Sequence, residues 1–98
     1  MEKTVTLSRR FTKNTFSIYQ YLLKQFSATV AYQFLDRLEK RVEFIIQNPE
    51  AGKPSQKRKN VRGILFTPHN QIFYRLKDDT IELLCIADMR KNPARRTY

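Results

Sequence analysis

Residues 27–49 read SATVAYQFLDRLEKRVEFIIQNP, and this stretch decides the architecture of the chain. Its apolar residues recur every three or four positions, the spacing of one face of an α-helix. That stripe consists of Val30, Ala31, Phe34, Leu35, Leu38, Val42, Ile45 and Ile46, while Arg37, Lys40, Glu43 and Gln47 face away. Ser27 is placed to cap the start, and Asn48-Pro49 ends the helix because proline pushes the residue before it out of the α region. We therefore expect a long amphipathic helix.

A second amphipathic helix is expected just before it, from Thr12 to Phe26. Thr12 is placed to cap its start, and Ser27 separates it from the helix that follows. Its apolar stripe consists of Phe11, Thr15, Ile18, Tyr19, Leu22, Leu23 and Phe26. Because almost no linker lies between them, the two helices are expected to form an antiparallel hairpin whose apolar stripes pack onto a common core.

Four segments have the composition of short β-strands. Residues 4–7 alternate β-forming side chains, and residues 61–66, 72–76 and 81–87 follow one another with connections short enough to make neighbours antiparallel. The last segment is apolar on both faces, which favours a central position in the sheet. One of its faces would carry Ile81, Leu83, Cys85 and Ala87, and the other Leu84 and Ile86.

The order of these elements predicts an α+β fold with an N-terminal strand, an antiparallel helical hairpin, and a three-stranded antiparallel sheet packed against the hairpin. A chain of 98 residues is too short for two hydrophobic cores, so residues 1–98 are expected to form a single domain. The core between hairpin and sheet is expected to include Leu22, Phe34, Leu38, Ile45, Leu84 and Ile86.

Cysteine and histidine usage limits the chemistry that the chain can perform. Cys85 is the sole cysteine and His69 the sole histidine, so neither an intrachain disulfide nor a Cys/His zinc site can form. In a central strand Cys85 is expected to be a buried small side chain rather than a nucleophile. No apolar run approaches the roughly 20 residues needed to span a bilayer, and residues 1–10 lack the apolar core of a secretion signal. We expect a cytoplasmic protein without metal or cofactor.

The whole chain carries a formal net charge of +10, and the positive charge is concentrated in its C-terminal half. No acidic residue lies between Glu50 and Asp78, nor after Asp88. A charged run is often only a solubilising surface, but two acid-free segments in one short chain favour a polyanionic or acidic partner. The residues expected to gather on one basic, target-binding surface are Lys57, Arg58, Lys59, Arg62, Arg75, Arg90 and Lys91.

Four local motifs resemble the RelE/ParE toxin superfamily, and the ParE-like members most closely. They are Asn-Pro-Glu-Ala-Gly at 48–52, Val-Arg-Gly at 61–63, Ile-Phe-Tyr-Arg at 72–75, and Ile-Ala-Asp-Met-Arg-Lys-Asn-Pro at 86–93. The resemblance covers nearly the whole chain. It implies the toxin of a type II toxin-antitoxin (plasmid stabilisation) system, held inactive in a hetero-oligomer by an antitoxin whose C-terminal segment wraps the toxin. Because the chain has no apolar run long enough to span a bilayer, no membrane partner is expected.

The resemblance leaves two activities open. A RelE-like ribosome-dependent messenger RNA endonuclease would use Arg90 at the strand end and Tyr98 in the tail, yet the position of the family's central-strand arginine falls on the uncharged Gln71. His69 lies in a predicted hairpin loop, where a histidine is usually only solvated. A ParE-like inhibitor of DNA gyrase needs no acid and base, and we favour it. A basic nucleic-acid-binding module without a toxin role is the third alternative; it lacks a recognition helix or ribonucleoprotein motif.

Overall fold

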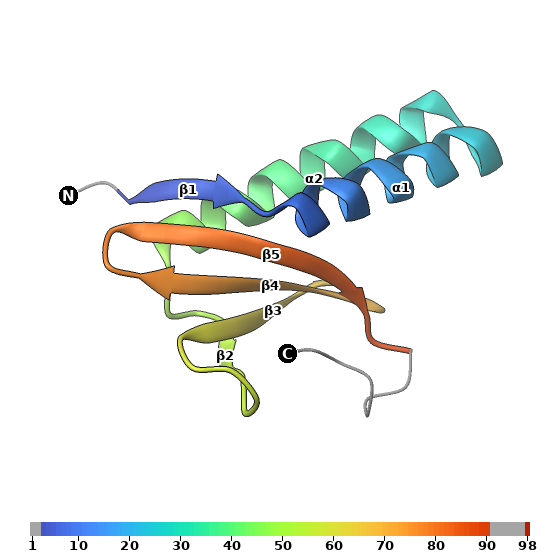
Figure 1. Cartoon of the computed structure of the whole chain (residues 1–98). Helices are drawn as coiled ribbons and strands as arrows, with labels where there is room; N and C mark the ends of the chain where they lie inside the picture. Colours follow the sequence, from blue (N-terminus) through green and yellow to red (C-terminus); the bar gives the residue numbers. More distant parts are fainter. Residues whose placement is uncertain (1–2, 91–97) are drawn as a thin grey trace.

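The computed structural model describes residues 3–90 and residue 98, and it confirms the α+β architecture (Figure 1). Strand β1 (Thr4–Leu7) leads into the helical hairpin of α1 (Arg9–Gln25) and α2 (Ala28–Gln47). The strands that follow are β2 (Lys53–Pro54), β3 (Val61–Thr67), β4 (Asn70–Lys77) and β5 (Thr80–Asp88). Among the described residues, no helix has the length and apolar character needed to cross a bilayer.

The sheet is wider than the three strands expected from sequence. Its order is β1-β5-β4-β3-β2; the pairs β5–β4, β4–β3 and β3–β2 are antiparallel, and β1 is parallel to β5. The predicted three-stranded sheet forms the centre. β1 lies parallel to the last strand because the helical hairpin separates β1 from the strands that follow and returns the chain before β3 begins.

Helix α1 begins three residues before the predicted capping position. Ser8, not Thr12, is the N-cap: its Oγ accepts a hydrogen bond from the Phe11 backbone N–H at 3.0 Å. The same hydroxyl donates to the carbonyl of Leu84 at 2.6 Å, so it also fixes the helix start to β5. Ser8 is the better cap because it directly follows the end of β1, where the backbone is still extended.

The boundaries of α2 agree with the sequence. Ser27 Oγ accepts from the Val30 N–H at 3.2 Å, and the helix ends at Gln47. At the C-terminus, the backbone N–H and the side-chain amide of Asn48 both donate to the carbonyl of Phe44, at 2.8 and 3.1 Å. These bonds satisfy a carbonyl that the helix end would otherwise leave exposed.

The main core lies between the hairpin and one face of the sheet. Phe34, Leu38, Ile45 and Ile86 are buried there as predicted, and Leu22 packs against them partly buried. The remaining buried members of this core are Phe11, Ile72, Tyr74, Ile81 and Leu83.

Leu84 is buried, but on the opposite side of the sheet from the one expected. The β4–β5 register passes from Phe73↔Cys85 to Tyr74↔Leu83, so Leu84 is the extra residue of a β-bulge. A bulge breaks the strict alternation of faces. Leu84 and Cys85 therefore both join a second, smaller cluster with Val61 and Phe73, on the face that the helices do not cover.

Three of the four motifs that carry the family resemblance meet at Tyr74. Its hydroxyl donates to the carbonyl of Pro49 at 2.8 Å and accepts from the Gly52 N–H at 3.0 Å. Arg62 completes the junction, because its guanidinium donates to the carbonyls of Gly52 and Glu50 at 2.7 and 3.1 Å. A Cβ on Gly52 would lie 2.6 Å from the Tyr74 hydroxyl oxygen, so this position requires glycine. Burial raises the pKa of the Tyr74 phenol, opposed by the Gly52 hydrogen bond and Arg62.

Removing the Tyr74 hydroxyl tests this junction. Tyr74→Phe leaves the ring packed but strips the Gly52 N–H of its buried partner, which costs about 1–3 kcal/mol. Urea unfolding measures the loss, and Tyr32→Phe is the control because the Tyr32 side chain is 61% exposed on α2. Equal stabilities of the two variants would show that the Tyr74 hydroxyl contributes nothing to holding the loop.

Candidate functional site

One face of the sheet carries the helical hairpin, and the other is its open face. Cross-strand partners share a face of a sheet, so the side chains of β4 can be assigned from their partners. Gln71 pairs with Ala87, and Phe73 pairs with Cys85, both of which pack in the cluster away from the helices. Gln71, Phe73 and Arg75 therefore follow one another along the open face of β4.

Arg75 is already paired within the open face. Its Nη1 lies 3.2 Å from Glu82 Oε1 on the neighbouring strand β5. Both side chains are more than a third exposed, so the pair contributes at most about 1 kcal/mol to stability. The pair lines a depression of about 600 Å³ together with Thr6, Lys77, Asp78 and Thr80. Glu82 thus offsets the charge that Arg75 would offer to an anionic target.

Tyr98 covers part of the open face. Its ring lies 5.5 Å from that of Phe73, centroid to centroid, and its carbonyl accepts a hydrogen bond from Ser55 Oγ at 3.2 Å. The Phe73 ring in turn lies over Gly63, where a Cβ would approach it to 2.7 Å. Figure 1 shows the C-terminus beside β2 and β3. These contacts hold the last residue against the second cluster.

The three basic residues Lys57, Arg58 and Lys59 lie in the exposed connection between β2 and β3. Ser55 organises this connection, because its Oγ accepts from the backbone N–H groups of Lys57 and Arg58 at 3.1 and 3.2 Å. The same hydroxyl donates to Tyr98, so the basic loop is anchored to the residue that covers the open face.

Arg62 does not lie on the open face with Arg75. It pairs with Tyr74, whose side chain is in the main core, whereas Arg75 pairs with Val61 of the second cluster. Adjacent strand positions point to opposite faces, and the guanidinium of Arg62 binds the carbonyls of the loop after α2. The prediction of one common basic surface is therefore wrong for Arg62, whose role is to hold that loop.

Arg90 follows the end of β5 and is held by Asp88. Two of its guanidinium nitrogens donate to the two carboxylate oxygens at 3.1 and 2.8 Å, and its backbone N–H donates to the same carboxylate at 2.9 Å. These hydrogen bonds and the charge of Asp88, with a smaller effect of Tyr21 on α1, raise the pKa of Arg90. It presents a permanently charged, exposed group at the strand end. Lys91, also a predicted site residue, lies outside the described residues.

The two residues considered as nucleophile or base are not placed for either role. Cys85 is buried, and burial raises the pKa of its thiol, with Arg10 opposing part of that effect. A protonated, enclosed thiol is a poor nucleophile. His69 is exposed in the turn between β3 and β4, where its backbone carbonyl accepts from the Met89 N–H at 2.7 Å. Within residues 3–90 and 98, no three His, Cys, Asp or Glu side chains cluster as metal ligands would.

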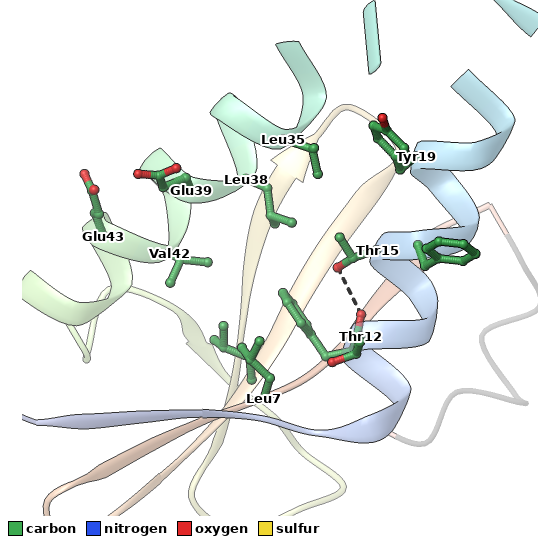
Figure 2. Close-up of a pocket in the computed structure, with 12 residues that line it drawn as sticks. Leu7, Thr12, Thr15, Tyr19, Leu35, Leu38, Glu39, Val42 and Glu43 are labelled. Atoms are coloured by element: carbon green, nitrogen blue, oxygen red, sulfur yellow. Dashed lines mark hydrogen bonds between the residues drawn. The ribbon is translucent and has the colours of Figure 1, made fainter. Parts of the chain in front are cut away.

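Sequence reasoning missed an apolar groove between α1 and α2. It encloses about 610 Å³, and Figure 2 shows Leu35, Leu38 and Val42 of α2 facing Thr15 and Tyr19 of α1 across it. The other lining residues are Leu7, Phe11, Thr12, Phe16, Glu39, Glu43 and Leu83.

The groove exists because the two helical stripes are only partly covered. Phe16 is 61% exposed and Leu35 is 36% exposed, while Phe26 at the hairpin tip is 63% exposed. The two stripes pack onto the core as predicted over much of their length, but Phe26 at the end of the first stripe does not, because the hairpin extends past the end of the sheet (Figure 1). Phe16 lies one position after Thr15 of the predicted stripe and therefore outside it. A large aromatic residue at that position indicates that α1 has apolar surface beyond the stripe that packs on the core.

The groove differs in charge from the rest of the molecule. Its charged lining residues are Glu39 and Glu43, one helical turn apart on α2, and Figure 2 shows both at the edge of the groove. In a chain of net charge +10 this edge is locally acidic. The groove therefore suits an apolar segment that carries a basic side chain at its margin.

Comparison with known proteins places these surfaces in a family. Residues 5–93 match the sequence model described as "ParE toxin of type II toxin-antitoxin system, parDE". No curated protein matches the chain in sequence.

Solved structures share the fold at low sequence identity. The chromosomal ParDE toxin-antitoxin system of P. aeruginosa superposes with a TM-score of 0.75 at 19% identity, over 89% of this chain and 96% of the other. The E. coli DinJ-YafQ toxin-antitoxin complex gives 0.66 at 14% identity, over 92% and 96%. The YoeB dimer from Staphylococcus aureus gives 0.55 at 16% identity, over 87% and 94%. The match to the family over nearly the whole chain decides the assignment: this chain belongs to the ParE toxins of type II toxin-antitoxin systems.

Proposed function

We propose that the chain is a cytoplasmic toxin that inhibits DNA gyrase by binding it, and that a cognate antitoxin neutralises it. The observation that carries this proposal is the chemistry of the open face. The position at which the family resemblance would put a nuclease arginine is Gln71, a neutral amide that pairs with Leu65 and Ala87 in the middle of the sheet. A neutral amide cannot offset the charge that builds on a phosphorane in RNA cleavage.

Two further features of the open face support binding rather than bond chemistry. Arg75 is matched by Glu82 at 3.2 Å, so its charge is offset before any substrate arrives. The Tyr98 ring lies on Phe73 and its carbonyl is held by Ser55, an arrangement that suits a packing residue. The exposed cations of the β2–β3 loop, and Arg90, whose side chain stays 67% exposed although it pairs with Asp88, would then supply electrostatic attraction to an acidic partner, which raises association rates.

The groove between α1 and α2 is the proposed site of the antitoxin. Its apolar lining would accept the apolar face of a helix, a common way in which a disordered segment folds on binding. Because Glu39 and Glu43 lie at the margin of the groove, we expect the bound antitoxin segment to carry a Lys or Arg that pairs with them. Acidic stretches of the antitoxin would instead lie over the basic loop and Arg90, so two regions of opposite charge would fix the direction of the bound segment.

The alternative function is that of a RelE-like nuclease, because the chain has Arg90 and Tyr98, the two residues that such a nuclease would use. As a nuclease residue, Arg90 would have to leave Asp88 and turn toward RNA, breaking two hydrogen bonds of 2.8 and 3.1 Å. Tyr98 would have to leave Phe73. Both rearrangements are costs that the gyrase proposal does not require.

The deciding experiment compares the two targets directly. We expect expression without antitoxin to arrest growth, and purified protein to inhibit supercoiling by gyrase while leaving messenger RNA in the ribosomal A site intact. Arg90→Ala should weaken association with gyrase in a salt-dependent way through a lower on-rate. Lys13→Ala on the exposed surface of α1 is the control for loss of one positive charge.

The opposite result has its own signature. The proposal would be contradicted if the protein cut ribosome-bound messenger RNA at defined codon positions and did not cut naked RNA. The protein would then be a nuclease rather than a gyrase inhibitor. In that case Arg90→Ala should lower the cleavage rate on the order of 100-fold while ribosome binding is retained.

A further inference from the structure

A basic patch lies on the outward face of α2, separate from both surfaces described above. Arg37, Lys40 and Arg41 line a depression of about 440 Å³ together with Phe44 and Phe66. Positions 37, 40, 41 and 44 are three or four apart, so they form one face of the helix. None of the five residues lines the groove between the helices, which α2 contributes to through its other face.

The charges of this patch are only partly offset within the protein. Lys40 pairs with Asp36 at 3.1 Å, but the two side chains are 74% and 62% exposed, and such a pair is readily exchanged for another partner. Arg37 has neither a hydrogen bond nor an ion pair to any of the residues 3–90 and 98. The charged residues that line the depression are all basic: Arg37, Lys40 and Arg41.

The aromatic residues give the patch a defined shape. The Arg41 guanidinium lies 5.5 Å from the centroid of the Phe44 ring, which orients it by a cation–π contact. Phe66 of β3 is fixed against the core residue Phe34 at 5.9 Å. The Phe44 contact therefore favours one orientation of the Arg41 side chain.

We propose that this patch binds the phosphodiester backbone of a nucleic acid. A planar guanidinium donates two parallel hydrogen bonds to one phosphate, and two arginines four positions apart lie about 5–6 Å from each other. That distance is between the Cβ atoms, and the long arginine side chains can spread or converge from it, so Arg37 and Arg41 can reach successive phosphates of a single strand. A patch with two arginines, beside which the carboxylate of Asp36 pairs with Lys40, suits a phosphate backbone better than the mixed-charge surface of a protein.

The inference is independent of the proposed gyrase target. Because α2 presents the patch and the groove on different faces, a segment bound in the groove leaves Arg37 and Arg41 accessible. The toxin is then able to hold nucleic acid both when free and when its groove is occupied.

Binding of the full chain to a fluorescent 20-base-pair duplex and to a 20-nucleotide RNA tests the proposal. Arg37→Gln with Arg41→Gln should lower affinity about 10-fold or more for at least one of the two ligands. For the duplex, the slope of log K against log salt should fall by about 2, one for each lost phosphate contact. The control is Lys13→Gln with Lys24→Gln on the exposed surface of α1, which removes the same net charge and should change affinity less than about 3-fold.

The two ligands identify the source of the phosphates. A loss confined to the duplex assigns the patch to DNA, and a loss confined to RNA assigns it to RNA. Equal losses in the patch variant and the control, or no loss in either, would overturn the proposal. Thermal melting of each variant verifies that it is folded. If the double variant is unfolded, Arg37→Gln alone should lower the duplex slope by about 1, and an unchanged slope would overturn the proposal equally.

Discussion

Phe16→Glu is expected to weaken binding of the cognate antitoxin about 100-fold. Phe16 lines the apolar groove, and with 61% of its side chain exposed in the free protein it offers a large aromatic surface to a partner. Buried aromatic residues at the centre of an interface typically contribute 2 kcal/mol or more, and a carboxylate placed there would also be desolvated beside Glu39 and Glu43. The toxin would then escape neutralisation while its own fold is retained.

Titration calorimetry or surface plasmon resonance with purified antitoxin measures this effect. Phe26→Glu is the matched control, because Phe26 is 63% exposed at the hairpin tip and is not among the residues that line the groove. It should change affinity less than about 3-fold. Equal affinity of the Phe16 and Phe26 variants would remove the groove as the antitoxin site. Loss of growth rescue by antitoxin in cells that express Phe16→Glu gives an independent readout.

The elements of the fold could be predicted because local signals decide them. Ser27 and Asn48 cap α2 through bonds to residues three and four positions away, so the sequence window contains both partners. The apolar period of α2 places Phe34, Leu38 and Ile45 in the core, since all three follow one face. Such features need no knowledge of what the helix packs against.

The features that were not predicted depend on contacts between distant segments. The bulge at Leu84 is set by the β4–β5 register, and it reverses the alternation of faces, so that Ile81 and Leu83 lie in the main core with Ile86 rather than on the face of Cys85. Ser8 caps α1 through the Phe11 N–H, and its hydroxyl also donates to the carbonyl of Leu84, 76 residues away, a bond that no local pattern indicates. In each case the sequence window around the residue lacks the partner that decides its role.

The candidate site was limited in the same way. Basic composition identified Arg62 and Arg75 together, but strand alternation and the register with β4 place them on opposite faces. From the sequence alone Arg75 was expected to be an available cation, whereas the register between β4 and β5 places Glu82 beside it. Charge counts predict the average field of the molecule, and only the pairing of strands determines which cations remain available.

Leu38→Ala is expected to lower the free energy of unfolding by about 2–5 kcal/mol. Leu38 is 7% exposed and packs in the main core, so truncation removes buried methyl groups and leaves a cavity that rigid neighbours fill only in part. For a domain of this size that is a large fraction of the total stability. Urea unfolding followed by circular dichroism measures the change.

Leu35→Ala separates the core from the groove. Leu35 precedes Leu38 by one helical turn on α2 and lines the same groove, but 36% of it is exposed, so its truncation in the free protein should cost about 1 kcal/mol or less. The effects on antitoxin binding should have the opposite order. Leu35→Ala should weaken binding more than Leu38→Ala, because a partner can still bury exposed surface of Leu35, whereas Leu38 is already almost fully buried in the free protein. A stability loss below about 1 kcal/mol for Leu38→Ala would mean that this side of α2 is not core. Leu38 would then belong to the partner surface.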